Sequence, residues 1–256
     1  DASFPRSYVQ YMYGSGGNIT NSNLSYLGYN AIYKRGVGFY NCADRTIENN
    51  TLVDVYGGIY IWRSDNFIIQ NNTVNGSRYG VYEYDSENIQ ILNNRLNSNK
   101  YGAFLHGGSR NRVDSNVMNA GIWGLTFAYG EHDSFANNNT LSSMVMTAIR
   151  FYHGSNNTLD NNTVVSCKHG YGLDRESYNN TIRNGSVHDS MDYDYFFWHP
   201  PNANRADDNH FVNTNFSAPR RICFGGDASM PCRFNYTDLL SEDLWMTTSI
   251  TSASYI

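Results

Sequence analysis

The feature that most constrains this chain is a short motif, apolar–x–Asn–Asn–Thr–apolar, that returns at a nearly constant interval. It reads IIQNNTV at residues 68–74, and TIENNTL, IQILNNRL, FANNNTL, TLDNNTV and TIRNGSV repeat it with small changes. The second residue of each pair falls at Asn50, Asn72, Asn94, Asn116, Asn139, Asn162 and Gly185, so every interval is 22 or 23 residues. A fixed period of this length indicates a repeat architecture.

Each repeat unit reads as two or three short strands, without a helix. Alternating apolar residues are separated by Asn, Gly, Ser and Asp, which are typical of turns. Aromatic–glycine dipeptides give a second marker, and each opens a strand: Tyr79-Gly80, Tyr101-Gly102, Trp123-Gly124 and Tyr171-Gly172. A leucine-rich repeat requires a leucine pattern that is absent here, and a propeller blade requires about 40 residues. The repeat therefore predicts an all-β fold, a right-handed parallel β-helix (solenoid) of about eight or nine rungs.

The asparagines fit the corners of such a solenoid. Stacked rungs lie about 4.8 Å apart, so asparagine side chains at equivalent corners can form ladders. Asparagine also tolerates the left-handed backbone that a tight corner requires. The weaker motifs at 19–24 and 211–216 extend the series at both ends. We therefore expect an N-terminal cap over residues 1–16 and a parallel β-helix over 17–226. Residues 227–256 are expected to form a C-terminal non-repeat tail that packs on the solenoid or on a neighbouring subunit.

The composition indicates an exported protein. The formal charge is −5, and no cluster of basic residues favours nucleic acid or an anionic membrane surface. No apolar run approaches the roughly 18 residues of a membrane span. The chain begins at Asp1 without an initiator methionine, which suggests a mature chain at the cell surface or outside the cell. Twelve N-x-S/T sequons are candidates for N-linked glycans: Asn18, Asn23, Asn49, Asn71, Asn75, Asn138, Asn156, Asn161, Asn179, Asn184, Asn215 and Asn235.

The I-x-N-N-T-V and Y-G-[IVL] elements resemble those of NosD-like or pectate-lyase-like parallel β-helix repeat proteins over roughly residues 17–226. That resemblance implies the fold, whereas its members include lyases, hydrolases, epimerases and proteins without known chemistry. The stretch YGLDRESYNNTIRNGSVHDSMDYDYF (171–196) is similar to the active-site rung of mannuronan C5-epimerases. Tyr171, Asp174 and Asp194 match that family's tyrosine and two aspartates. Arg175 and Glu176 depart from it, and Glu176 stands where the family has its acid/base histidine.

Alternation along the strands predicts two outward columns of side chains. One runs Tyr60, Tyr82, Phe104, Thr126, Arg150, Asp174 and Phe196; the next runs Trp62, Tyr84, His106, Ala128, Tyr152, Glu176 and Trp198. Aromatic, carboxylate and guanidinium groups together suit a saccharide groove. An exposed apolar stripe equally suits a contact between subunits. The same alternation places Glu83 and Arg175 inward, which indicates a local shift of register.

No metal-ligand spacing links the histidines, and we expect no cofactor and no metal site, with structural calcium left open. Cys223 and Cys232 bracket a loop that a disulfide can close. Cys42 and Cys167 lie about five rungs apart, which is too far for a disulfide within one straight solenoid. They are expected to be free buried thiols, the alternative being a bond to another chain.

The leading functional hypothesis is a glycosylated surface or structural protein that self-assembles into a filament, sheath or layer through its aromatic stripe and terminal strands. The alternatives are a uronan C5-epimerase or lyase, and a non-catalytic glycan-binding module. In an enzyme, Tyr171, Asp174, Glu176, Asp194 and Arg150 are the candidate catalytic residues. The expected partners are further copies of the chain or a polysaccharide.

Overall fold

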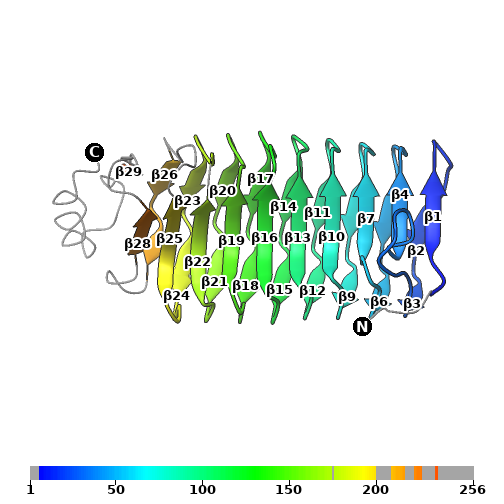
Figure 1. Cartoon of the computed structure of the whole chain (residues 1–256), viewed down its shortest axis with the longest axis horizontal. Helices are drawn as coiled ribbons and strands as arrows, with labels where there is room; N and C mark the ends of the chain where they lie inside the picture. Colours follow the sequence, from blue (N-terminus) through cyan, green and yellow to red (C-terminus); the bar gives the residue numbers. More distant parts are fainter. Residues whose placement is uncertain (1–5, 175, 200–208, 217–221, 227–233, 236–256) are drawn as a thin grey trace.

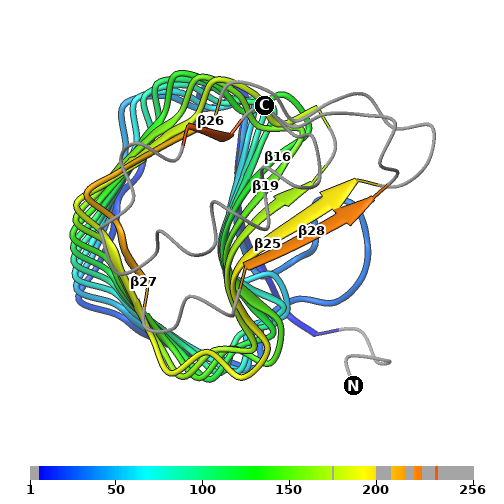
Figure 2. The ribbon, with the colours of Figure 1, turned by 90° about the vertical axis from the view of Figure 1, so that its left-hand side faces the viewer.

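The computed structural model describes residues 6–174, 176–199, 209–216, 222–226 and 234–235. Three parallel sheets run along one axis, and seen end-on the rungs superimpose into a closed outline (Figures 1 and 2). Each sheet takes one strand from every rung, and each strand pairs with the equivalent strand 22 or 23 residues away on most rungs. The described residues form no helix, and thus none that could cross a membrane. The predicted parallel β-helix is confirmed.

Sheet A contains β1 (Val9–Met12), β4 (Val37–Tyr40), β7 (Ile59–Trp62), β10 (Tyr79–Tyr84), β13 (Tyr101–His106), β16 (Trp123–Ala128), β19 (Thr147–Tyr152), β22 (His169–Asp174), β25 (Tyr193–His199) and β28 (Ile222–Gly226). Sheet B contains β2 (Ile19–Thr20), β5 (Thr46–Glu48), β8 (Ile68–Gln70), β11 (Gln90–Leu92), β14 (Arg112–Asp114), β17 (Phe135–Asn137), β20 (Thr158–Asp160), β23 (Thr181–Arg183), β26 (Asn209–Val212) and β29 (Phe234–Asn235). Sheet C contains β3 (Asn23–Ser25), β6 (Thr51–Val53), β9 (Thr73–Asn75), β12 (Arg95–Asn97), β15 (Val117–Asn119), β18 (Thr140–Ser142), β21 (Thr163–Val165), β24 (Ser186–His188) and β27 (Asn215–Phe216).

The ends differ from the expected caps. Strand β1 lies within residues 1–16, yet it pairs with β4 and belongs to the first rung rather than covering it. Strand β29 lies within residues 227–256 and extends sheet B through its pairing with β26. The end-on view shows β25 and β28 turned away from the preceding strands of sheet A (Figure 2). The solenoid repeat therefore reaches further toward both ends than the motif does.

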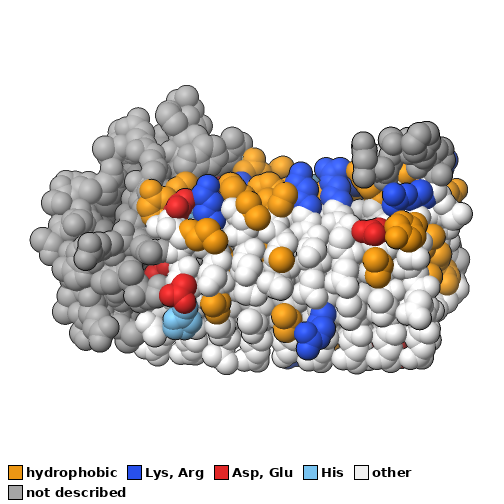
Figure 3. Space-filling model, turned by 90° about the horizontal axis from the view of Figure 1, so that it is seen from below, with side chains coloured by type: hydrophobic (Ala, Val, Ile, Leu, Met, Phe, Trp, Pro, Cys, Tyr) orange, Lys and Arg blue, Asp and Glu red, His pale blue; other side chains and the backbone are white. Residues whose placement is uncertain are grey.

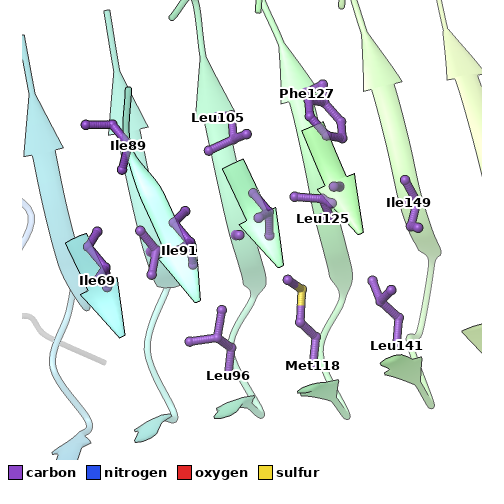
Figure 4. Close-up of a cluster of buried hydrophobic side chains, with 14 of the residues drawn as sticks. Ile69, Ile89, Ile91, Leu96, Leu105, Met118, Leu125, Phe127, Leu141 and Ile149 are labelled. Atoms are coloured by element: carbon purple, nitrogen blue, oxygen red, sulfur yellow. The ribbon is translucent and has the colours of Figure 1, made fainter. Parts of the chain in front are cut away.

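The core is a set of inward columns of apolar side chains. Ile69, Ile91 and Val113 occupy equivalent places in sheet B and are fully buried. Leu96, Met118 and Leu141 do the same in sheet C, and the close-up shows these side chains pointing into the interior (Figure 4). Each such side chain contributes about 1.5–3 kcal/mol by leaving water. The alternation of one apolar residue between two polar ones thus fixes which face of each three-residue strand is inside.

The two asparagines of each pair have different roles. The first lies exposed at the corner between sheets B and C with a left-handed backbone, as at Asn71 (φ 56°). The second is buried, and its side chain joins a ladder inside the corner. In this ladder, Asn72 Nδ2 donates to Asn94 Oδ1 at 3.0 Å and also to the carbonyl oxygen of Ile47 at 2.8 Å. The ladder supplies partners to polar backbone that the core would otherwise leave unpaired.

The glycine of the aromatic–glycine marker lies where successive rungs approach closely. A Cβ atom at Gly80 would lie 2.5 Å from the carbonyl oxygen of Gly102. On β19 the equivalent place is taken by Ala148. The register then pairs Thr147 with His169 of β22, so Gly170 is the equivalent glycine and the marker on that rung is His169-Gly170. The prediction that used Tyr171-Gly172 is therefore wrong by two residues. Glycine is required at position 172 for a different reason: the methyl group of Thr147 occupies the space that a Cβ atom would need.

Candidate functional site

The outward face of sheet A carries the aromatic side chains that the sequence predicted. Tyr60 and Tyr82 stack at 4.6 Å between ring centroids, and Tyr82 and Phe104 stack at 5.5 Å. Tyr60 is only 1% exposed and Tyr82 only 6%. Arg35, from the segment before β4, donates to the Tyr60 hydroxyl at 3.0 Å and lies over its ring. The expectation of an exposed first column is therefore wrong at these rungs, because neighbouring rings and the preceding segment cover it.

The second column is half-buried and stacks on itself. Trp62 and Tyr84 lie 3.8 Å apart with nearly parallel rings, and the His106 ring follows 4.6 Å from Tyr84 at a tilt of 56°. Tyr129, which is 53% exposed, stacks on His106 at 4.5 Å. Rings stacked on successive rungs cover one another's faces and expose mainly their edges to solvent. This arrangement leaves little ring face for stacking on a sugar.

A second row of rings lies at the start of the same strands. Tyr79, Tyr101 and Trp123 stack at 5.2 and 4.7 Å. Arg78 lies over Tyr79, and Lys100 lies over both Tyr101 and Trp123 at 5.8 and 5.7 Å. In the view from below, Lys and Arg side chains lie beside hydrophobic ones along the upper edge (Figure 3). Such cation–aromatic contacts are worth about 0.5–1 kcal/mol where they are exposed.

The observed register corrects both outward columns at β22. Arg150 pairs with Gly172 and Tyr152 pairs with Asp174, so Asp174 belongs to the second column rather than the first. Glu176 lies beyond the end of β22 and is in neither column. Across β25, Gly172 pairs with Phe196 and Asp174 with Trp198. The cause is the two-residue error in the glycine marker.

Arg150 and Asp174 nevertheless meet across the two strands. Arg150 Nε donates to Asp174 Oδ2 at 2.6 Å, and Nη2 contacts the same oxygen. The guanidinium carbon lies 4.7 Å from the centre of the Tyr152 ring. The side chains are 23% and 7% exposed, so the ion pair is largely removed from water. A guanidinium held by a carboxylate in this way is already neutralised before any ligand arrives.

Two histidines lie near this pair on the chain. His153 Nδ1 lies 3.3 Å from Glu176 Oε2. His169 stacks on Phe196 at 5.0 Å and on Tyr193 at 5.5 Å, and burial lowers its pKa. Its Nδ1 atom is buried without a hydrogen-bond partner among the described residues. The sequence interpretation gave His169 no place in the site; recognising His169-Gly170 as the in-phase marker would have placed it opposite Tyr193 on the next rung.

Two further candidate catalytic residues, Tyr171 and Asp194, are not accessible. Tyr171 is fully buried in the hydrophobic core, and burial raises the pKa of its phenol far above the usual range. The assignment of Tyr171 as a proton-transfer residue is therefore wrong, because its side chain points into the solenoid. Asp194 is also fully buried. The side chains of Arg175 and Trp198 lie outside the described residues. Of the five candidate catalytic residues, Arg150 and Asp174 form an ion pair with each other.

Most of the sequons lie at the corners between strands. The asparagine is exposed at Asn18, Asn23, Asn49, Asn71, Asn138, Asn156, Asn161, Asn179, Asn184 and Asn215. Asn75 is half-buried, and the side chain of Asn235 lies outside the described part. Neighbouring sequons touch, since Asn161 Nδ2 donates to Asn138 Oδ1 at 2.8 Å and Asn179 Nδ2 to Asn156 Oδ1 at 2.6 Å. A glycan on one of these side chains would crowd the next rung.

These features define a solenoid protein with a polar ladder inside its corners and an aromatic outward sheet. The chain belongs to the NosD family: the family model described as "Periplasmic copper-binding protein (NosD)" matches residues 13–218. The predicted resemblance to NosD-like proteins is confirmed. No curated protein sequence matches this chain significantly.

Solved structures that resemble the chain include alginate-active enzymes. A double mutant of the periplasmic alginate epimerase AlgG gives a TM-score of 0.79 at 17% identity, covering 91% of this chain and 62% of that chain. An alginate lyase from Paenibacillus gives 0.55 at 10% identity, covering 84% and 92%. The A-module of the Azotobacter vinelandii mannuronan C-5 epimerase AlgE4 gives 0.50 at 12% identity, covering 87% and 77%. The chain spans less than two thirds of AlgG. At these identities the likeness concerns the fold.

The family description names copper, and the described side chains do not fit such a site. They contain no group of three or more His, Cys, Asp or Glu residues placed to hold a metal ion. Cys42 and Cys167 are free and buried. Cys42 follows β4 of sheet A and Cys167 follows β21 of sheet C, on different corners. The predicted disulfide between Cys223 and Cys232 lies outside the described side chains, and calcium binding stays a prediction.

Proposed function

We propose that this chain is an exported structural β-helix that works by associating with further copies of itself, and that its epimerase-like rung does not catalyse a reaction. The observation that carries the proposal is how that rung uses its polar residues. Tyr171 packs in the core, Asp194 is fully buried and Asp174 holds Arg150. All three side chains are buried. An epimerase or lyase needs such groups to face a bound sugar.

Exposed apolar side chains near the first rung support association. Five large ones are exposed by 39–72%: Tyr8, Tyr13, Tyr26, Ile32 and Tyr33. Tyr8 precedes β1 and Tyr13 follows it, Tyr26 follows β3, and Ile32 and Tyr33 lie in the segment before β4. An apolar surface of this kind often marks a contact with another protein. This end of the solenoid is thus a better candidate for the contact than the stacked aromatic columns.

The proposed location follows from the relatives. The descriptions of the family and of AlgG both name the periplasm. Exposed asparagines at the sequons would accept glycans if the chain passes an oligosaccharyltransferase. We therefore infer an exported protein with candidate glycan sites at the exposed corners, of which Asn18 and Asn23 lie on the first rung beside the proposed contact.

The test is the assembly state of the purified chain. Sedimentation velocity over a hundredfold range of concentration, with electron microscopy of the concentrated sample, should show oligomers or filaments. Ile32→Glu should reduce association at least tenfold, because it places a charge in the apolar contact. Tyr178→Glu, at a site that is 49% exposed on another part of the solenoid, is the matched control and should leave association unchanged. A monomer at every concentration would refute the proposal.

A second candidate is polysaccharide binding at Arg150, and the resemblance to alginate-active enzymes favours it. Here a uronate carboxylate would compete with Asp174 for the guanidinium, beside the Tyr152 ring. Incubation with alginate and pectate, followed by absorbance of unsaturated products and by proton exchange at C5, tests catalysis. Calorimetry with the oligosaccharides tests binding alone. Activity that Asp174→Asn abolishes would establish an enzyme and overturn the first proposal.

A further inference from the structure

Two glutamates lie fully buried inside the solenoid. Glu83 belongs to β10 and occupies an inward place between Ile61 and Leu105 on the neighbouring strands. Glu131 follows β16, at the corner between sheets A and B. Neither forms an ion pair with a Lys, Arg or His side chain of the described residues. An isolated ionised carboxylate in such surroundings is costly, so these two require an explanation.

Both carboxyl groups lie where an internal ladder of hydrogen bonds passes from one set of side chains to another. On the early rungs the ladder uses serines: the Cys42 amide donates to Ser64 Oγ and the Ser64 amide to Ser86 Oγ, each at 3.0 Å. On later rungs it uses residues three places further along, as the Asn111 amide donates to Ser134 Oγ at 2.9 Å and the Ser134 amide to Asn157 Oδ1 at 3.0 Å. The two ladders meet at Asn111, whose Nδ2 atom donates to the carbonyl oxygen of Ser86 at 3.3 Å.

The glutamates connect them. Gly108 occupies the next place after Ser86 and has no side chain to accept the Ser86 amide, which donates to Glu83 Oε1 at 2.6 Å instead. The Gly108 amide in turn donates to Glu131 Oε2 at 2.9 Å. Glu131 Oε1 accepts from Asn111 Nδ2 at 2.9 Å and from Ser134 Oγ at 2.6 Å, which ties it to the second ladder. Together with Asn111, which bonds both Ser86 and Glu131, the two glutamates thus form the joint between the two ladders.

The two carboxyl groups approach the same glycine. A Cβ atom at Gly108 would lie 2.6 Å from Glu83 Oε1, while the amide of Gly108 is bonded to Glu131. Two negative charges that both lie beside one buried glycine repel each other, and one proton between them removes most of the repulsion. We propose that Glu83 and Glu131 hold one proton between them at neutral pH, and that losing this proton at alkaline pH loosens the joint between the two ladders.

The surrounding charges agree with this assignment. Burial, followed by repulsion from Glu131, raises the pKa of Glu83 well above its usual range, and Asp85 adds to the effect. Burial raises the pKa of Glu131 to about 7 against hydrogen bonds from Ser134, Asn111 and Gly108 and a weak opposite influence of His132. The other titratable group beside Glu83 is His106, whose backbone amide donates to Oε2 at 2.9 Å and whose ring pKa is lowered by burial.

The sign of the pH dependence follows. In the unfolded chain both glutamates titrate near 4.5, whereas in the folded chain the pair keeps its proton to higher pH. The folded state therefore binds more protons than the unfolded state above pH 4.5, and its stability falls as the pH rises toward the raised values. Each unit of pKa difference corresponds to about a tenfold change in the folding equilibrium.

The experiment uses the full chain and does not depend on the proposed self-association. Infrared difference spectra should show a protonated carboxyl band at pH 7 that disappears at alkaline pH. Hydrogen exchange at the Ser86 and Gly108 amides should speed up by roughly tenfold or more between pH 6 and 9, after correction for base catalysis. Glu83→Gln and Glu131→Gln should each change the carboxyl band and lower the pH at which it disappears, because the remaining carboxyl group stays buried but no longer has a charged neighbour. Glu48→Gln changes a half-buried glutamate bonded to Gln70 and should alter neither.

If a variant does not fold, the infrared band of the wild-type chain and its loss on raising the pH still decide the matter. Absence of a protonated band at pH 7 would overturn the proposal. So would stability at pH 8 that requires added Na⁺ or Ca²⁺, because the pair would then hold a cation rather than a proton.

Discussion

Asn94 Nδ2 donates a hydrogen bond to Asn116 Oδ1, 3.0 Å away on the next rung. The same nitrogen donates to the carbonyl oxygen of Ile69 at 2.8 Å, and Asn94 Oδ1 accepts from both the amide and the side chain of Asn72. A single buried side chain thus contacts three rungs. The repeat of asparagine at this corner is therefore a requirement of the stacking itself.

Replacing Asn94 with alanine should destabilise the chain by about 3–5 kcal/mol, because several buried donors and acceptors lose their partners at once. The measurement is the midpoint of guanidinium unfolding, followed by tryptophan fluorescence. The matched control is Asn93→Gly at the same corner, where the exposed residue has a left-handed backbone (φ 55°) that glycine adopts without strain. We expect a change within about 0.5 kcal/mol for the control. Equal effects of the two substitutions would contradict the ladder's role.

Replacing Tyr171 with phenylalanine should leave stability unchanged or raise it by about 1 kcal/mol. The Tyr171 hydroxyl is buried without a hydrogen-bond partner among the described residues, so its removal relieves a desolvation cost. Thermal unfolding of the two proteins gives the comparison. A variant that unfolds like the wild type but loses an activity on alginate would instead restore Tyr171 to a catalytic role.

The period and the alternation of residues predict most of this fold. Asn72 and Asn94 lie at equivalent corners 22 residues apart, and a chain that places identical side chains at one spacing can stack them in only a few ways. Glu83 is inward, as the same alternation predicts. Prediction fails at His169, because two glycines lie close together in HGYG and only one of them marks a close approach of rungs. Sequence alone does not distinguish a glycine required by a neighbouring carbonyl from one beside a threonine methyl.

The exposure of the aromatic residues was not predictable for a related reason. Alternation assigns Tyr60 to the outward face correctly but says nothing about what covers that face. The covering group is Arg35, 25 residues away and outside the repeat, and it bonds the Tyr60 hydroxyl. Segments without periodicity carry no register, so their contacts must come from the structure.

The thiols of Cys42 and Cys167 should not react in the native protein. Both are buried, and burial raises the pKa of the Cys167 thiol, which lowers the fraction of reactive thiolate. Alkylation before and after denaturation, with the labelled peptides identified by mass spectrometry, separates these two cysteines from Cys223 and Cys232. Rapid labelling of native Cys167, or its recovery in a disulfide to another chain, would show that the thiol is accessible.

The ion pair of Arg150 and Asp174 should stabilise the fold by about 1–3 kcal/mol in a double-mutant cycle of Arg150→Gln and Asp174→Asn. The reason is its burial, since the side chains are only 23% and 7% exposed. The control cycle uses Arg63 and Asp85, a pair on the same side of the solenoid with side chains that are 60% and 40% exposed. Exposed pairs of this kind typically couple by less than about 1 kcal/mol. If Asp174→Asn leaves stability unchanged and abolishes binding of alginate oligosaccharides, the pair belongs to a ligand site, and the structural role proposed for this rung is refuted.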